Sequence, residues 1–225
     1  HTGQLYIQKH LDYERKKSYN VSVLVEDLGD PPRSDSAIVS ISVTDVNDNA
    51  PVFIDSPYVA YVRENLETFP VHVAQVSARD EDSAPNSVIS YSMLTGDRSL
   101  FKVNSTTGEI EALRTLNREE REQYSITVRA MDSGSPRLSS TGTILIRVED
   151  VNDNTPIFQH QTYQAVISEN APPSSPVLTV QASDADAGIN AQLRYSLSDD
   201  GNSYFTVVPE TGVIKTTTNL DREVR

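Results

Sequence analysis

The sequence contains no cysteine and no tryptophan among its 225 residues. Without cysteine, disulfide bonds and thiolate metal sites are excluded, and the redox compartment of the protein stays open. No stretch approaches the roughly 20 apolar residues that a membrane-spanning helix needs, and no signal peptide is visible. No amphipathic helical stripe of useful length occurs either. These absences favour a chain built from strands and loops.

Positive charge is also scarce. The chain carries 19 Lys and Arg residues against 32 Asp and Glu residues, which gives a formal net charge of −13 and a pI near 4.6. Such a balance argues against nucleic acid and against anionic membrane surfaces as partners. We therefore expect the acidic surface to meet cations or a basic partner.

One acidic stretch occurs twice. Residues 45–53 read Asp-Val-Asn-Asp-Asn-Ala-Pro-Val-Phe, and residues 150–158 read Asp-Val-Asn-Asp-Asn-Thr-Pro-Ile-Phe, 105 positions later (150 − 45). Asp and Asn are depleted in strands, and proline cannot continue a hydrogen-bonded ladder. Each copy therefore reads as an extended acidic connector between folded units. We predict the C-terminal part of one repeat in residues 1–53, a complete repeat in 54–158 and the N-terminal part of a further repeat in 159–225.

Short alternating segments fill the space between the connectors. Val21, Val23 and Val25 alternate with smaller or polar residues, as half-buried strands do. Residues 58–62, 71–76, 89–93, 124–128 and 143–148 show strand patterns, and Thr-Gly and Gly-Ser-Pro turns separate some of them. About seven such strands per repeat predict an all-β fold of tandem immunoglobulin-like Greek-key β-sandwiches.

Further acidic clusters recur in register with the connectors. Glu64-Asn65 matches Glu169-Asn170, and Asp12-Tyr13-Glu14 matches Asn117-Arg118-Glu119 and then Asp221-Arg222-Glu223. Asp80-Glu81-Asp82 matches Asp184-Ala185-Asp186, and Asp27 matches Asp132. So many carboxylates would repel one another if they were gathered. A hard divalent cation would remove that repulsion, and Ca²⁺ suits such a set better than Mg²⁺, which wants a stricter octahedron and keeps its waters.

In these motifs the chain resembles the extracellular repeats of the cadherin superfamily over its full length. The motifs are Glu-Asn near a repeat's start, Asp-x-Asp, the Leu-Asp-Arg-Glu type, the Ala-x-Asp type and the Asp-x-Asn-Asp-Asn linker. Near-identical repeats without cysteine are similar to long members of the fat, dachsous or protocadherin type. The resemblance implies up to three Ca²⁺ ions at each junction between repeats, with ligands from both repeats and the linker.

Carried over residue by residue, the resemblance implies two ligand sets. At the first junction these are Asp12, Glu14, Asp45, the backbone carbonyl of Val46, Asn47, Asp48, Asn49, Asp80, Asp82, Asn86 and Asp132. At the second junction they are Glu64, Glu119, Asp150, Val151, Asn152, Asp153, Asn154, Asp184, Asp186 and Asn190. Asn117 stands where the family has Asp, so we expect weaker binding at the outermost ion there. The family's glutamate at the start of the first repeat would lie before residue 1, and Asp221 and Glu223 would serve a later junction.

Other interpretations fit the sequence less well. Asp184-Ala185-Asp186 could open an EF-hand loop, but the twelfth position is Tyr195 and no helices flank it. Paired carboxylates suggest glycoside hydrolysis, yet they recur once per repeat without one converging cleft, so we expect no enzyme. The four histidines, His1, His10, His72 and His160, show no ligand spacing.

The resemblance implies calcium-dependent cell–cell adhesion by an extracellular segment of a single-pass cell-surface protein. In this interpretation calcium stiffens a rod that presents recognition surfaces, and the partner is another cadherin ectodomain, homophilic or heterophilic, without direct membrane contact by this segment. A passive structural spacer with no partner contact is the alternative. Two N-glycosylation sequons, at Asn20 and Asn104, weakly support a secreted context.

Overall fold

The computed structural model describes residues 3–198 and 203–222, and within these ranges it contains strands, turns and loops but no α-helix. His1 and Glu223, which the sequence singled out, lie outside the described residues. No helix in the described part of the chain is long and apolar enough to cross a membrane. The strands are β1 (Ser18–Glu26), β2 (Ser34–Ser42), β3 (Val52–Phe53), β4 (Tyr58–Arg63), β5 (Val71–Gln75), β6 (Ala78–Arg79), β7 (Ser90–Thr95), β8 (Phe101–Val103), β9 (Glu109–Ala112), β10 (Gln123–Met131), β11 (Ser139–Glu149), β12 (Ile157–Phe158), β13 (Pro176–Thr179), β14 (Ala182–Ser183), β15 (Phe205–Val207) and β16 (Val213–Thr216).

The chain divides into two compact units. The first comprises residues 1–62, 66–115 and 123–147, and the second comprises residues 63–65, 116–122 and 148–225. The first acidic connector therefore lies within the first unit, and the second connector lies within the second unit together with Glu64 and Glu119. This division differs from a cut at the connectors, and the repeat boundaries at residues 53 and 158 stay a prediction.

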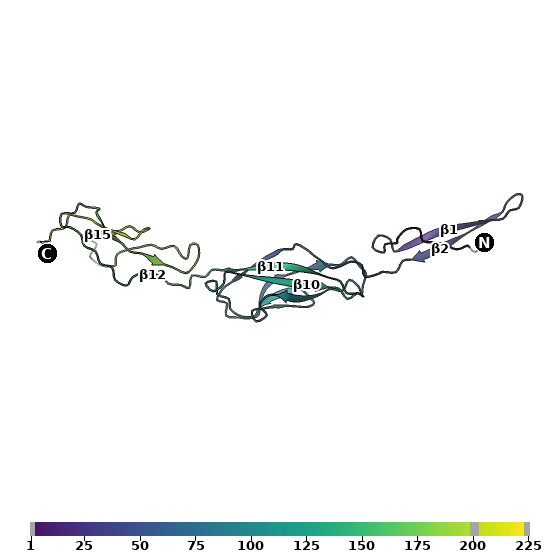
Figure 1. Cartoon of the computed structure of the whole chain (residues 1–225), viewed down its shortest axis with the longest axis horizontal. Helices are drawn as coiled ribbons and strands as arrows, with labels where there is room; N and C mark the ends of the chain where they lie inside the picture. Colours follow the sequence, from purple (N-terminus) through teal and green to yellow (C-terminus); the bar gives the residue numbers. More distant parts are fainter. Residues whose placement is uncertain (1–2, 199–202, 223–225) are drawn as a thin grey trace. The chain divides into compact units, whose positions relative to one another are not determined.

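The middle repeat is built from two main antiparallel sheets. One has the strand order β4-β11-β10-β7 and the other the order β5-β9-β8, and β3 pairs with β6. Strands β10 and β11 of the first sheet are labelled in Figure 1. The alternation around Tyr124 and Ile126 appears in β10 as a strict alternation of exposed or half-buried and fully buried residues. Period-2 alternation in the sequence thus becomes one apolar face and one solvated face of the sheet.

The core of this repeat lies between the two sheets. Ile126, Ile144 and Ile146 are fully buried, and Ile126 lies directly opposite Ile144 in the β10–β11 register. Phe101 on β8 contacts Tyr124 on β10 edge-on, with ring centroids 5.3 Å apart, and so joins the two sheets. Edge-to-face aromatic pairs stabilise a core by roughly 0.5–1.5 kcal/mol beyond their buried area. The packing agrees with the predicted sandwich.

The third segment repeats the plan of the middle repeat. Its sheets have the orders β12-β14 and β13-β16-β15, which match β3-β6 and β5-β9-β8. The Tyr91 hydroxyl accepts a hydrogen bond from the Ala78 N–H at 2.9 Å, and the Tyr195 hydroxyl accepts one from the Ala182 N–H at 3.0 Å. Tyr91 on β7 thus holds β6, and Tyr195, which lies outside the strands, holds β14 in the same way, whereas Tyr61, at 57% exposure, lies on the outer face of β4.

The first segment differs from the expected half-buried strands. β1 and β2 pair antiparallel over nine residues, with Val21 opposite Val39. Val23 and Val25, on the same face as Val21, are nevertheless 41% and 65% exposed. The reason is that the sheet of this segment contains only two strands among the described residues, so no second sheet covers its apolar face.

The glycine of the Thr-Gly turn in the middle repeat has a steric explanation, which Gly212 shares in the third segment. Gly108 has a φ of +71°, and a Cβ there would lie 2.4 Å from the Val76 carbonyl oxygen. We predict that Gly108→Ala destabilises the middle repeat by at least about 1–3 kcal/mol, because alanine resists this backbone conformation and also collides with rigid backbone. Gly188→Ala is the control, since Gly188 has a φ of +58° but no neighbouring atom within 4 Å of the place that an added Cβ would take. Hydrogen–deuterium exchange of the strands measures both changes, and equal losses would contradict the steric argument.

Candidate metal centres at the two connectors

At the first connector, Asp45 is tied to the loop that follows β6. Its Oδ2 accepts hydrogen bonds from the Ser83 N–H at 3.2 Å, the Ser83 hydroxyl at 2.9 Å and the Asn86 amide at 2.9 Å. Asn49 binds the same loop, because its side-chain amide donates to Asp82 Oδ1 at 2.7 Å. The connector is therefore held by polar contacts with the loop between β6 and β7, in which the predicted ligands Asp80, Asp82 and Asn86 lie.

Asn47 is fixed from the opposite side of the connector. Its Nδ2 donates to Asp132 Oδ2 at 3.1 Å and to the Pro136 carbonyl at 2.6 Å. Asp132 is 1% exposed and accepts bonds from the N–H groups of Gly134 and Leu138. A Cβ at Gly134 would lie 2.0 Å from Asn47 Cγ, so only glycine leaves room for this amide. The Asn47 amide nitrogen thus donates to Asp132 and to Pro136, and the Asn47 Oδ1 is buried without a hydrogen-bond donor.

Several oxygens at the first connector are buried without a hydrogen-bond donor. They are Glu14 Oε1, Asp45 Oδ1, Asn47 Oδ1 and Asp80 Oδ2. Carboxylate oxygens of Glu14, Asp45 and Asp82 lie within 4.8 Å of one another. Buried oxygens without a donor are costly and rare, whereas a hard cation accepts such oxygens as ligands. The donor set fits Ca²⁺.

The carboxyl groups of the first connector perturb one another's ionisation. Burial raises the pKa of Asp80, and the charges of Asp82, Asp132 and Asp45 raise it further. The pKa of Glu14 is also raised, although a backbone hydrogen bond favours its ionised form, because burial and the nearby Asp45 and Asp48 oppose ionisation. Burial alone would raise the pKa of Asp45, but the bonds from Ser83 and Asn86 hold it below its ordinary value. The cluster thus carries uncompensated negative charge.

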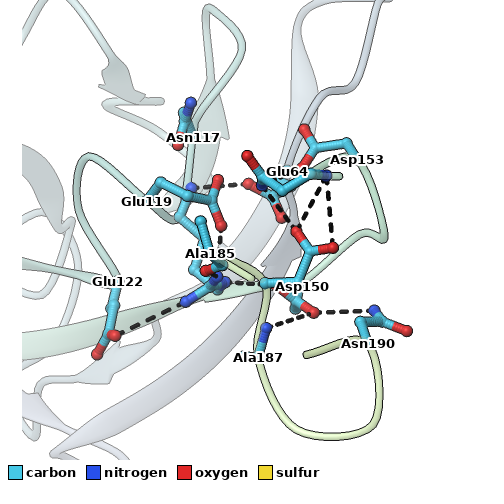
Figure 2. Close-up of polar contacts among 12 residues, drawn as sticks. Glu64, Asn117, Glu119, Glu122, Asp150, Asp153, Ala185, Ala187 and Asn190 are labelled. Atoms are coloured by element: carbon cyan, nitrogen blue, oxygen red, sulfur yellow. Dashed lines mark hydrogen bonds and ion pairs between the residues drawn. The ribbon is translucent and has the colours of Figure 1, made fainter. Parts of the chain in front are cut away.

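At the second connector, Glu64 forms a buried anchor. It is 1% exposed, and its two carboxylate oxygens accept hydrogen bonds from the backbone N–H groups of Arg118 at 2.7 Å and Val151 at 2.8 Å. Asn65 adopts a positive φ of 56°, which asparagine tolerates better than most residues, and its amide donates to Asp153. The Glu-Asn motif thereby joins the end of β4, the loop 116–122 and the connector. Figure 2 shows Glu64 and Asp153 of this group.

The connector itself repeats the contacts of the first. Asp150 Oδ2 accepts bonds from the Ala187 N–H at 3.1 Å and the Asn190 amide at 2.9 Å. The Asn154 amide donates to Asp186 Oδ1 at 2.7 Å, and Asp184 Oδ1 accepts from the Asp186 N–H at 3.0 Å. Two groups of carboxylates gather here, each with oxygens within 4.8 Å: Glu64 with Glu119 and Asp153, and Glu119 with Asp150 and Asp186.

A guanidinium group lies among the second set of carboxylates. The Arg118 Nε donates to Asp150 Oδ1 at 2.5 Å, and one terminal nitrogen donates to Glu119 and, at 2.5 Å, to the Ala185 carbonyl (Figure 2). Burial would lower the pKa of Arg118, but the hydrogen bond and charge of Asp150 raise it, so the group is charged. Burial likewise would raise the pKa of Asp150, but bonds from Ala187, Asn190 and Arg118 lower it.

Some predicted ligands lie apart from these groups. Asp12 Oδ1 accepts a bond from the Arg15 N–H at 2.8 Å, and Asn117 Oδ1 accepts one from the Glu120 N–H at 3.1 Å, so both side chains close a local turn. Asp48 and Asn152 are exposed, and Val46 turns its side chain to solvent at 64% exposure. Their assignment as ligands stays a prediction.

Sequence reasoning missed three residues of these sites. Ser83 and Gly134 support Asp45 and Asn47, and Arg118 enters the carboxylate cluster. The only signal for Arg118 was its place between Asn117 and Glu119 in an acidic motif with few cations nearby. Sequence could not show the direction of its side chain.

Both sequons lie in described parts of the fold. Asn20 is exposed within β1, where its Oδ1 accepts a bond from the Ser40 hydroxyl at 2.9 Å. Asn104 is half-buried at a turn, where its Oδ1 accepts bonds from the N–H groups of Thr106 and Thr107. Glycosylation at either residue stays a prediction.

The fold and the sites together define a tandem β-sandwich protein with acidic connectors. The Cadherin domain family profile matches residues 1–44, 58–149 and 163–225. The chain is 45% identical over 224 residues to Protocadherin Fat 4 of Mus musculus, in a match that covers all of this chain and 4% of that protein. It is similar to the crystal structure of the protocadherin GammaB4 extracellular domain, with a TM-score of 0.86, 33% identity and coverage of 96% of this chain and 36% of that one. The cis-dimer structure of protocadherin gammaB7 EC3-6 is also similar, with a TM-score of 0.84 and 33% identity. That match covers 96% of this chain and 54% of the gammaB7 chain.

The chain belongs to the cadherin family. This confirms the resemblance inferred from the acidic motifs, including its fat and protocadherin type, and the all-β fold of tandem repeats. Cadherin domains generally bind Ca²⁺, and the carboxylate groups described above have the chemistry for it. The chain spans only a small part of its curated relative.

Proposed function

We propose that this chain is a segment of a calcium-dependent adhesion ectodomain in which Ca²⁺ at the two connectors stiffens the chain of repeats. At the first connector Glu14, Asp45, Asn47, Asp80 and Asp82 would hold the ion or ions. At the second, Glu64, Glu119, Asp150, Asp153 and Asp186 would do so. The other ligands predicted from the sequence would complete sets of up to three ions each.

The observation that carries this proposal is the group of buried oxygens without a donor at the first connector, on Glu14, Asp45, Asn47 and Asp80. These atoms come from the loop before β1, the connector and the loop between β6 and β7. A divalent cation bound among them would cancel the repulsion between carboxylates and tie the three parts together. Because such binding needs the ordered arrangement, it would stabilise that arrangement by mass action.

Membership of the cadherin family supports a cellular location and a class of binding partner. We infer that the segment belongs to a cell-surface membrane protein with its repeats outside the cell, and that the partner is another cadherin ectodomain, homophilic or heterophilic. The gammaB7 relative is described as a cis-dimer, which supports such pairing. Extracellular calcium sites bind with dissociation constants of about 10⁻⁴–10⁻³ M, which suits a medium with millimolar calcium. Repeats of residues 1–53, 54–158 and 159–225 would be the units that calcium links.

A passive spacer is the second candidate. The connectors recur once per repeat, so a segment that only sets distance would have the same calcium sites. Binding of this segment and of its longer parent protein to a cadherin ectodomain, measured side by side, separates the two functions.

We expect chelation of calcium to make the chain more flexible in solution. Small-angle X-ray scattering of one sample, first in millimolar Ca²⁺ and then after addition of a chelator, measures this change. A profile that turns from stiff to flexible or compact is the expected result, because the connector carboxylates repel without the ion. An unchanged profile, with no heat of calcium binding in a parallel titration, would overturn calcium stiffening.

A further inference from the structure

The two connectors differ in one cation. Arg118 lies at the second connector with a side chain only 10% exposed, next to Asp150 and Glu119, whose side chains are 15% and 20% exposed. At the aligned position of the first connector the residue is Tyr13. Among the described residues no Lys or Arg forms an ion pair with Glu14, Asp45 or Asp80, and these are the side chains that carry oxygens without a donor.

The guanidinium has enough acceptors to be a stable buried cation. It contacts Asp150 in the connector, Glu119 in its own loop and the Ala185 carbonyl in the loop after β14, and it lies 3.7 Å from Glu122 (Figure 2). Charge-assisted bonds of this kind are about twice as strong as neutral ones. A single side chain thus connects three chain segments of the second unit that a bound metal ion would also connect.

The same contacts oppose a metal ion. Asp150 and Glu119 belong to one of the carboxylate groups that could hold a divalent cation, together with Asp186. A fixed positive charge on these two oxygens repels a second cation and occupies lone pairs that it needs. Calcium binding at Asp150 and Glu119 must therefore overcome the charge of Arg118 and compete for the oxygens that it contacts.

We propose that Arg118 is a built-in counter-cation of the second connector, which orders that connector without calcium and competes with calcium for Asp150 and Glu119. This inference rests on the proposed function. It assigns different calcium requirements to the two connectors. The first, with Tyr13, has no such cation and needs calcium to offset its carboxylates, whereas the second keeps its order when calcium falls and requires a higher calcium concentration for saturation.

Hydrogen–deuterium exchange of the whole chain, with and without a chelator, tests the ordering. The amides of Ala187 and Val151 report on the second connector, since they donate to Asp150 and Glu64, and the Ser83 amide, which donates to Asp45, reports on the first. With chelator we expect the Ala187 amide of the unmodified chain to stay protected and Arg118→Gln to speed its exchange about tenfold, as loss of a charged hydrogen bond would. Arg114→Gln removes the same charge at an exposed position and should change nothing.

Calcium titration followed by the NMR chemical shifts of the same amides tests the competition, because a shift reports binding even where protection does not change. Arg118→Gln should lower the calcium concentration at half-saturation of the second connector by several-fold, up to about tenfold. The reciprocal variant Tyr13→Arg should raise protection of the Ser83 amide in chelator and weaken calcium binding at the first connector. The Tyr13→Arg variant still tests the inference if Arg118→Gln fails to fold.

The outcomes separate the inference from the function on which it rests. Unchanged Ala187 exchange in Arg118→Gln with chelator overturns the ordering role, and an unchanged or higher calcium midpoint overturns the competition. If calcium protects neither connector of the unmodified chain, the proposed function fails and the competition fails with it. The chelator comparison then still decides whether Arg118 orders the connector.

Discussion

Replacement of Glu64 by alanine is expected to lower the free energy that holds the second connector closed by about 2–4 kcal/mol, even without calcium. Glu64 is 1% exposed, and its two oxygens accept the backbone N–H groups of Arg118 and Val151. Alanine leaves both donors without a partner, and each unsatisfied buried group costs about 1–3 kcal/mol. Loss of repulsion with Glu119 and Asp153 offsets part of this cost.

The matched control for this change is Glu169→Ala. Glu169 begins the same Glu-Asn motif in the third repeat, but it is exposed, and no hydrogen bond to its carboxylate is seen among the described residues. Amide exchange of Val151 in the presence of a chelator measures the effect of Glu64→Ala. If Glu64→Ala and Glu169→Ala leave that amide equally protected, the carboxylate of Glu64 is a calcium ligand at most and has no structural role of its own.

The sequence predicts most of the fold because its signals are local. Alternation in β10 and β11 marks the buried isoleucines, and a glycine after threonine marks a turn that only glycine fits, as Gly108 shows. Repetition supplies the rest, since two copies of one acidic stretch cannot both be accidental loops. These patterns require no knowledge of which residues meet in space.

The sites are less predictable because they depend on directions of side chains. The sequence placed Asp12 and Glu14 in one motif, yet Asp12 closes a turn whereas Glu14 joins the carboxylate group with Asp45. It could not show that Arg118 points into the cluster instead of into solvent. The alternation of Val23 and Val25 marks the side of β1 that a second sheet would cover, but it does not show whether such a sheet is present, and both residues are exposed.

The contrast between the connectors leads to the second large effect, at Asp45. Its Oδ2 accepts three hydrogen bonds from Ser83 and Asn86, and its Oδ1 is a buried oxygen without a donor. We predict that Asp45→Ala, in millimolar calcium, speeds exchange of the Ser83 amide by about 100-fold. This corresponds to about 2.7 kcal/mol, the strength of one or two hydrogen bonds to a charged group.

The change should be confined to the first connector. Asp150 holds the equivalent place in the second unit with partners of its own, so exchange of the Val151 and Ala187 amides should not change. Asp35→Ala, which removes the same charge from the exposed strand β2, should leave the Ser83 amide at its original rate. Loss of protection at both connectors in Asp45→Ala would mean that the acidic clusters act through total charge. Loss at the first alone would mean that each connector is a separate site, held by its own carboxylates and its own cation.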